Sequence, residues 1–389
     1  MRRWLAMVLT AGCGPSVATA PALDSGSGTT GSGDTSQGAS SSGADGTSSA
    51  ASSSDPGTSE SGTAPPSCFR EPSGETLGSL EWVVTESNGV YGSDVAWSPS
   101  AVFTIGAAAL RRYEHDGELT WSTSWDGPGE YQTNGVRIAA LQDGSLAAVY
   151  TTDTTWLVGF DDDGGERWRF ELAQAASVDL FATASGVLVV GSRQTGRDTG
   201  FEQRLLDLDF EGGVLDDDRV TLELEYPYGI MQHADMDASG DVVLAGTVGF
   251  GVDRGWVLQL DAEHEQIAFE DVGPADDVAA AFTPESDLVV FAGEFGGKKI
   301  LWRGELGGPR EWEQEVTQVT AYELEVDCDG RIYLAFGAVT CYAPDGALSW
   351  ISEDGADVSA FAFDPEGGLY TVGGYGTELA LQLARIVAH

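Results

Sequence analysis

The amino-acid sequence predicts an all-β fold: a seven-bladed β-propeller whose last blade is closed by the N-terminal strand and which follows a disordered tether. Three observations carry this prediction. An aromatic residue recurs after acidic-Gly turns, short alternating strands lie between Gly, Asp and Pro residues, and the two ends of the folded region have complementary patterns. Residues 75–389 nowhere sustain a helical spacing of apolar residues over three turns, so helices are not expected.

The repeat is defined by the aromatic residue in the last strand of each copy. Neighbouring copies lie roughly 40 residues apart, and each has room for four short strands, as β-propeller blades do. The aromatic series runs Trp82, Trp121, Trp168, a copy without Trp near Val220, Phe269, Trp312 and Trp350. The turns after the first strands form a second series of the same size: Ser100, Gly144, Gly186, Gly240, Ser286, Gly330 and Gly368.

The chain ends predict how the ring closes. The last copy stops after three strands and has no Trp strand. The segment Ser79-Leu-Glu-Trp-Val-Val-Thr-Glu is similar to Ala347-Leu-Ser-Trp-Ile-Ser-Glu, the fourth strand of the sixth copy. We therefore expect strand 79–86 to complete the seventh blade, which leaves no open join between the first and last blades.

The spacing of the Asp-Gly turns and tryptophans also resembles a known family. Asp116-Gly117 before Trp121, Asp163-Gly164 before Trp168 and Asp345-Gly346 before Trp350 are similar to the repeats of quinoprotein-like propellers. The Gly-x-x-x-Val-x-Gly halves resemble repeats of extracellular propellers in bacterial envelope lipoproteins. The quinone enzymes have eight blades, a calcium site and two adjacent cysteines, whereas this chain has seven copies and no Cys-Cys pair. The resemblance therefore implies the fold rather than the activity.

The N-terminus resembles a bacterial lipoprotein signal. Two arginines precede a short apolar run, and small residues precede Cys13, so residues 1–12 are expected to be removed and Cys13 to carry lipid. An ordinary secretory signal is the alternative. Gly14 after the cysteine implies the outer membrane. Residues 24–66 are almost all Ser, Gly, Thr, Ala, Asp and Pro, which predicts a disordered tether within 13–67, ahead of a propeller at 68–389.

The formal net charge of −43 argues against nucleic-acid binding, because phosphate backbones would be repelled. It fits solubility in an exterior rich in salt, or binding of calcium or a cationic partner. Asp235, Asp237, Ser239 and Gly240 match the opening of a calcium loop, but Gly246 stands where the loop needs a bidentate acid. A hairpin turn is the favoured interpretation, with calcium as a weak alternative and no cofactor expected.

Three cysteines besides Cys13 are available in an oxidising compartment. Cys328 and Cys341 are separated by a short loop and are the first choice for a disulfide. Cys68 with Cys328 is the second choice, and Cys341 could instead be a core thiol. His115 and His264 lie near turns and are expected on the surface.

Positive charges and aromatics are predicted to gather on one face of the ring. In a propeller, the loops that join second to third strands share a face with those that join fourth to first strands. We expect this arc to bind an acidic glycan or an acidic protein surface. Its residues are Arg193, Arg197, Tyr226, Tyr228, Phe250, Arg254, Phe295, Lys298 and Lys299.

The expected function is a non-catalytic binding or assembly platform for protein or glycan, exposed to periplasm or exterior and attached to the membrane only by lipid. The alternatives are an enzyme, either a quinoprotein-like oxidoreductase or a carbohydrate-active propeller, and a calcium-stabilised structural protein. No catalytic signature is present in the sequence. An enzyme should bring acids and a histidine together at the central channel, whereas a platform should not.

Overall fold

The structure of the chain is a computed structural model. It describes residues 79–86, 92–106, 109–124, 134–151, 154–172, 177–194, 201–222, 229–249, 254–294, 296–317, 323–352, 357–364, 368–375 and 380–387. These residues belong to one compact unit within Ser59–His389. The predicted signal, lipidated Cys13 and tether lie outside the described residues. None of the described residues forms a helix that is long and apolar enough to cross a bilayer.

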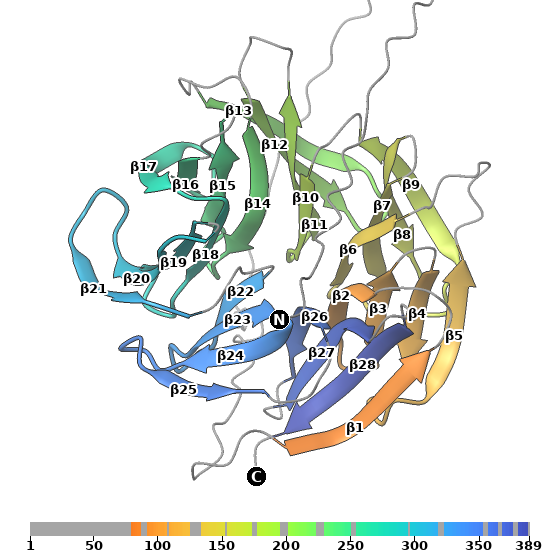
Figure 1. The fold of residues 1–389 in the computed structure, drawn as a ribbon. Coiled ribbons are helices and arrows are strands. Elements are labelled where there is room, and N and C mark those ends of the chain that lie inside the picture. Colours follow the sequence, from red (N-terminus) through yellow and green to blue (C-terminus); the bar gives the residue numbers. More distant parts are fainter. Residues whose placement is uncertain are drawn as a thin grey trace, which may run out of the picture. The chain divides into compact units, whose positions relative to one another are not determined.

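The described strands form seven four-stranded antiparallel sheets, which are the predicted blades (Figure 1). Blade 1 contains β2 (Gly92–Trp97), β3 (Val102–Gly106), β4 (Ala109–Tyr113) and β5 (Leu119–Ser124). Blade 2 contains β6 (Asn134–Ala140), β7 (Leu146–Thr151), β8 (Thr155–Phe160) and β9 (Glu166–Leu172). Blade 3 contains β10 (Ser177–Ala182), β11 (Gly186–Gln194), β12 (Phe201–Asp209) and β13 (Val214–Leu222).

The later blades repeat this order. Blade 4 contains β14 (Gly229–Met236), β15 (Val242–Val248), β16 (Arg254–Leu260) and β17 (Gln266–Pro274). Blade 5 contains β18 (Asp277–Phe282), β19 (Leu288–Gly293), β20 (Lys299–Gly304) and β21 (Arg310–Glu315). Blade 6 contains β22 (Glu323–Val326), β23 (Ile332–Phe336), β24 (Ala338–Tyr342) and β25 (Leu348–Ile351). Blade 7 contains β26 (Asp357–Phe363), β27 (Gly368–Tyr375), β28 (Ala380–Val387) and β1 (Ser79–Glu86).

The first strand of each blade is the innermost one. These strands contact one another in the order β2, β6, β10, β14, β18, β22, β26 and back to β2, so they surround a central axis. The expected closure is confirmed, because β1 pairs antiparallel with β28 from Ser79↔Val387 to Glu86↔Leu381. The predicted number of blades and the predicted closing strand are therefore both correct.

Burial follows the position of a strand within its blade. Strands in the middle of a blade, such as β15 and β19, are buried along their whole length and consist almost entirely of Val, Leu, Ala, Phe and Gly. They lie between two neighbouring blades, so both faces of the strand need apolar side chains. The outermost strands β5 and β21 alternate between exposed and half-buried residues, because only one face contacts a neighbouring blade.

The antiparallel order places the turns on two faces. Turns that join first to second strands and third to fourth strands lie on one face, which we call the turn face. The remaining connections lie on the opposite face, which we call the loop face. Acidic residues of the turn face are mostly exposed; they are Asp116, Asp161, Asp162, Asp163, Asp209, Glu211 and Asp345.

Tryptophans in the outermost strands of blades 1, 2 and 5 attach each of these blades to the next one. The indole N–H groups of Trp121, Trp168 and Trp312 donate to the carbonyl oxygens of Asp162, Phe210 and Pro344, at 2.8, 2.9 and 2.9 Å. Each acceptor lies in the turn between the third and fourth strands of the following blade. A glycine of the same turn lies against the ring: Gly164, Gly212 and Gly346 respectively. These three rings thus pack between neighbouring blades.

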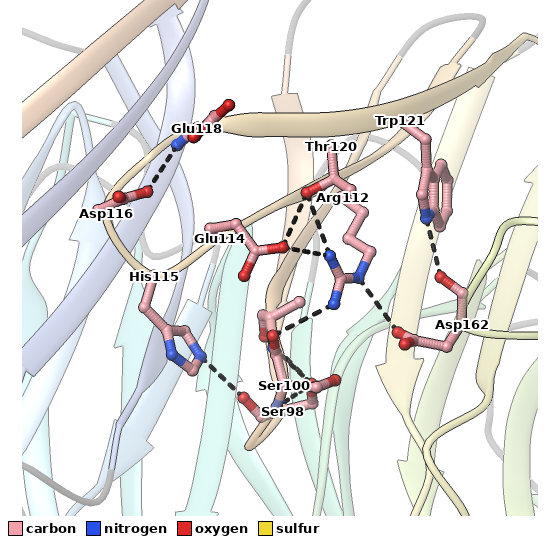
Figure 2. A network of polar contacts seen from close by, with 11 residues as sticks. Ser98, Ser100, Arg112, Glu114, His115, Asp116, Glu118, Thr120, Trp121 and Asp162 are labelled. Carbon is pink, nitrogen blue, oxygen red and sulfur yellow. Dashed lines mark hydrogen bonds and ion pairs between the residues drawn. The ribbon is translucent and has the colours of Figure 1, made fainter.

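An ion-pair network reinforces the first of these junctions (Figure 2). Arg112 of blade 1 donates from Nε to Asp162 of blade 2 at 3.1 Å and from one terminal nitrogen to Glu114 at 2.6 Å. The same terminal nitrogen is 3.1 Å from the hydroxyl of Thr120, and the other donates to the carbonyl of Ser100. Asp162 thus receives the arginine on its side chain and the Trp121 indole on its carbonyl, which links two blades through one residue.

The junction between blades 3 and 4 departs from this pattern. The third blade has Val220 where the other copies have Trp or Phe, and the next turn has His264 where the others have glycine. His264 adopts a φ of 63°, which is rare outside glycine, and its Nδ1 lies 2.9 Å from Asp218 Oδ2 of blade 3. Its side chain is only 7% exposed, so the expectation of a solvated surface histidine is wrong. The imidazole makes a contact between blades at the junction that lacks an indole.

Candidate functional site

Polar side chains converge on the central axis from the innermost strands. Asp94 comes from β2, Arg137 from β6, Asp179 from β10, His233 and Asp235 from β14, and Glu323 and Glu325 from β22. Apart from Asp235, sequence reasoning did not single out any of them. An enzyme is expected to bring acids and a histidine together at the central channel, and these residues do so. Whether they are free to react with a substrate depends on the hydrogen bonds that each group makes.

Three of the carboxylates hold backbone amides of the next blade. Asp94 Oδ2 accepts from the N–H of Ile138 at 2.8 Å, and Asp235 Oδ2 accepts from Phe282 at 2.8 Å. Glu323 Oε2 accepts from Phe361 at 3.1 Å. In each case the donor belongs to the innermost strand of the following blade. These acids therefore connect neighbouring innermost strands, and burial raises the pKa of Asp94 to about 6.

Arg137, Asp179 and His233 also make hydrogen bonds. Arg137 Nε donates to Asp179 Oδ1 of the next blade. His233 Nε2 accepts from the backbone N–H of Leu324 at 3.3 Å, across the intervening strand β18, whose residues at this level are Ala279, Ala280 and Ala281. Burial lowers the pKa of His233, which keeps the imidazole neutral. Its bonded nitrogen is committed to the backbone and is not available to accept a proton from a substrate.

A pocket of about 920 Å³ lies at one end of this axis. Its walls come from the ends of the innermost strands of blades 1, 4, 5, 6 and 7 and from the turns that follow three of them, so the pocket lies at the turn-face end of the axis. The apolar wall includes Trp97, Phe282 and Phe363. The acidic wall consists of Asp235, Asp237 and Glu325, and no Lys, Arg or His belongs to the described lining.

Glu325 differs from the other acids of the axis. No hydrogen bond or ion pair joins its carboxylate to any described residue. Burial, together with the charges of Asp235 and Asp94, raises its pKa to about 8. An acid with this pKa is mainly protonated at neutral pH while the pocket is empty. Among the described residues, Glu325 is therefore the acidic group of the pocket that has no bonded partner.

The aromatic wall is held from outside the pocket. The ring of His115 stacks on Trp97, with centroids 5.9 Å apart and planes inclined by 10°. His115 Nε2 lies 3.0 Å from the carbonyl oxygen of Ser98, which fixes the ring (Figure 2). His115 is thus half-buried behind the pocket rather than free in solvent as expected. Its ring covers one face of the Trp97 indole.

Comparisons with known proteins support the fold and go no further. No protein-family model and no curated protein matches the chain. A structure described as the Dos1 propeller superposes with a TM-score of 0.51 at 11% identity, covering 84% of this chain and 83% of that one. BamB from Moraxella catarrhalis gives 0.46 at 12% identity, covering 83% and 94%. A Bacteroides caccae protein of unknown function gives 0.40 at 13%, covering 59% and 83%.

The calcium candidates form a turn. Asp237 Oδ1 accepts from the backbone N–H groups of Ser239 and Asp241 and from the Ser239 hydroxyl, at 2.8, 3.0 and 2.7 Å. Gly240 has a φ of 95°, which suits this hairpin. Asp235 points into the axis and bonds Phe282. Within the described ranges, no three His, Cys, Asp or Glu residues are placed to hold a metal ion.

The first-choice disulfide is wrong. Cys328 is disulfide-bonded, but Cys341 keeps its thiol, whose Sγ lies 3.8 Å from the carbonyl oxygen of Tyr342. Cys341 lies in β24 and packs in the core with Tyr333 and Trp350, which confirms the alternative of a core thiol. Its side chain therefore points into the blade rather than toward the turn that carries Cys328. Cys13 and Cys68, the other two cysteines, lie outside the described residues.

We expect Cys68 to be the partner of Cys328, because Cys13 is predicted to carry lipid. Mass mapping of non-reduced peptides should recover Cys68 joined to Cys328, and Cys341 should react with alkylating reagents only after unfolding. Cys328→Ser should lower the free energy of unfolding by about 2–4 kcal/mol, since the cross-link closes a long loop. A Cys328–Cys341 peptide would contradict the assignment.

The predicted basic arc is only partly described. Arg254 donates to both oxygens of Asp271, with the shortest contact at 2.7 Å, and Lys298 lies 3.8 Å from Glu313. These two cations are thus compensated by neighbouring acids on the same surface. Lys299 begins β20, and Arg193 belongs to β11. The remaining members, Arg197, Tyr226, Tyr228, Phe250 and Phe295, lie outside the described residues, and the arc stays a prediction.

Glu325→Gln should change the dependence of stability on pH. A carboxyl whose pKa rises from 4.5 to about 8 on folding favours the folded state least at high pH, because folding opposes its ionisation. The wild-type protein should therefore lose stability between pH 5 and pH 9 through this group. The variant should match wild type at pH 5 and exceed it by about 1–3 kcal/mol at pH 9. Chemical denaturation at both pH values measures this, and an equal difference at both would contradict it.

Proposed function

We propose that this protein is a non-catalytic binding module of the bacterial envelope that holds a protein partner on the turn face of its propeller. The observation that supports this most is the pocket of about 920 Å³ at the turn-face end of the axis. Its mixed aromatic and acidic walls, with the acidic turns around it, suit an inserted side chain of a partner. This site replaces the loop-face arc as our first candidate.

The bonding of the axial acids favours binding over catalysis. A general acid–base pair needs groups that are free to exchange protons with a substrate. Asp235 accepts two backbone N–H groups, from Met236 and Phe282, and Asp237 is committed to its turn. His233 is not part of the described lining of the pocket. Most of these acids thus have a structural role that explains their presence.

A carbohydrate-active enzyme is the second candidate, and one observation favours it. Glu325, whose pKa of about 8 would suit a general acid, shares the pocket with Asp235 and with aromatic side chains that could stack on sugar rings. Hydrolysis of cell-wall or capsular glycans by wild type, and its loss in Glu325→Gln, would support this candidate. Products of hydrolysis that Glu325→Gln also forms would reject it.

The envelope address rests on the N-terminal sequence. Cys13 after a short apolar run supports lipidation, and Gly14 supports retention at the outer membrane. Wild-type protein should partition with the outer-membrane fraction and incorporate labelled palmitate, whereas Cys13→Ser should do neither. Palmitate incorporation that persists in Cys13→Ser would reject the lipid anchor.

Site-specific cross-linking in the native host tests the binding function. Benzoylphenylalanine would replace Ser239, which lines the pocket on the turn face, and in a matched protein Lys298, which is 53% exposed on the loop face. The proposal expects one defined adduct at Ser239, reproduced with the purified partner, and none at Lys298. Adducts confined to Lys298 would favour the basic arc instead, and the absence of an adduct at Ser239 would overturn the proposal.

A further inference from the structure

The hydrogen bonds of the three pocket carboxylates indicate which of them is available to a positively charged ligand. Among the three lining carboxylates, Asp235 and Asp237 already accept backbone N–H groups. Glu325 has no bonded partner within the described part of the chain. Glu325 is half-buried, and a half-buried carboxylate without a partner loses part of its hydration and gains nothing in return, so a ligand cation is the group that would compensate it.

A second polar group in the wall points the same way. Thr283 lines the pocket and is only 4% exposed, and no described residue makes a hydrogen bond with its hydroxyl oxygen. Unsatisfied buried hydroxyls are rare in folded proteins and commonly mark a missing ligand or water. A ligand that donates several hydrogen bonds would satisfy both Thr283 and Glu325. Alkylammonium groups carry three donors and no acceptor.

The aromatic walls of the pocket indicate which chemical group should carry the cation of the ligand. Trp97, Phe282 and Phe363 give the pocket apolar surface, and aromatic faces attract organic cations. A cavity of about 920 Å³ is far larger than a bare ion, which would instead need several ligands gathered around one point. The dimensions and chemistry suit an apolar stem that ends in a cation.

We propose that the axial pocket binds an alkylammonium group, with its nitrogen at Glu325 and Thr283 and its apolar stem against the aromatic wall. The proposal rests on the proposed binding function and names its chemistry: a lysine side chain of the partner inserts into the pocket. A free diamine has the same chemistry, and the test below separates the two sources. This specificity is opposite in charge to that expected for the loop-face arc.

The proposal makes binding depend on pH. While the pocket is empty, Glu325 is held protonated by burial and by the charges of Asp235 and Asp94, and Glu323 lies two residues before it in β22. Arg137 pairs with Asp179 and His233 is bonded to the backbone, so neither supplies the missing positive charge at Glu325. An ammonium ion favours the ionised carboxylate, so binding should release a proton below about pH 8. Affinity should rise with pH in that range.

Calorimetry on the full-length protein tests the inference. The ligand is Nα-acetyl-lysine methylamide, and its matched control is Nα-acetyl-norleucine methylamide, which keeps the stem and lacks the ammonium. The lysine ligand should bind at least about tenfold more tightly than the control, and its affinity should rise about tenfold from pH 6 to pH 8.5. Titration in buffers of different ionisation enthalpy should show proton release at pH 7 in the wild-type protein.

Variants locate the effect. Glu325→Gln should weaken lysine-ligand binding about tenfold and abolish its pH dependence, whereas Glu285→Gln, an exposed turn-face residue paired with Arg303, should stay within about twofold. Equal binding of the two ligands, or no proton release, would overturn the inference without needing any variant. Binding that Glu325→Gln leaves unchanged would also overturn it.

The outcome is separable from that of the binding function. If cross-linking at Ser239 captures a partner but the lysine ligand does not bind, the ammonium inference fails and the binding function stands. If the lysine ligand and cadaverine bind while Ser239 captures no partner, the pocket chemistry stands and free diamines are its source. In that case the protein-partner proposal fails.

Discussion

Deletion of β1 is expected to abolish cooperative folding of the propeller. The strand supplies the fourth position of blade 7, and its removal would leave β28 as an open edge with unpaired backbone groups. Trp82, whose ring lies against Gly117 of blade 1, would also be lost. The total exceeds several kcal/mol, which is comparable to the whole stability of an ordinary domain.

A buried charge makes the effect of β1 larger than strand pairing alone. Glu86 at the end of β1 accepts from Arg111 Nε at 2.7 Å and from the Tyr113 hydroxyl at 2.8 Å, both in blade 1. The Arg111 side chain is 4% exposed. Removing one partner of a buried ion pair leaves an uncompensated charge and costs about 3–5 kcal/mol. Strand β1 therefore joins blade 7 to blade 1 as well as completing blade 7.

Thermal and urea unfolding of three proteins separate these contributions. Deletion of residues 68–86 should remove the cooperative transition, and deletion of 24–66 should leave the melting temperature unchanged. Glu86→Gln should lower the free energy of unfolding by about 3 kcal/mol. The matched control is Glu81→Gln, because Glu81 lies in the same strand and pairs at the surface with Arg385 of β28. It should lower the free energy of unfolding by less than about 1 kcal/mol. Equal melting temperatures for the two deletions would contradict the role of β1.

The sequence predicted the fold because repetition makes the pattern redundant. Each blade has a glycine or small residue at one turn, and all blades except the third have an aromatic residue at the repeat position of the last strand, so many weak signals agree on one architecture. The closing strand was predictable for the same reason, since the segment around Trp82 is similar to the one around Trp350. Val220 and His264 both break the repeat, but nothing in the sequence pattern indicates that these two departures lie at the same junction.

The axial site was not predictable, because the alternation of polar and apolar residues along a strand does not show whether its polar face lies against solvent or against other strands. The segment Glu323-Leu-Glu-Val has the pattern of a strand with one solvent-exposed face, but in β22 the face that carries the two glutamates lies toward the axis of the ring. Whether an alternating acid is solvated or buried depends on six other strands that contribute to the same axis. The disulfide failed for a related reason: a short loop between two cysteines does not determine the direction of either side chain.

Glycine substitutions in three turns should form a graded series. Three turn glycines have similar positive φ angles: 84° at Gly144, 82° at Gly164 and 78° at Gly212. Substitution of each by Ala therefore carries a similar conformational cost of about 1 kcal/mol. The space around them differs. A Cβ at Gly144 would meet nothing within 4 Å, one at Gly164 would lie 3.1 Å from the Trp121 ring, and one at Gly212 would lie 2.7 Å from the Trp168 ring.

We therefore expect Gly144→Ala to cost about 1 kcal/mol, Gly164→Ala somewhat more, and Gly212→Ala about 2–4 kcal/mol, because its methyl group displaces the indole of the preceding blade. Displacement also breaks the hydrogen bond from Trp168 to the carbonyl of Phe210. Urea denaturation of the three variants measures the order. In a double-mutant cycle, Trp168→Leu should remove most of the excess cost of Gly212→Ala, while it should add independently to the cost of Gly144→Ala. Equal costs at all three glycines, or an additive Gly212–Trp168 pair, would show that the indole contact does not determine how the blades are joined.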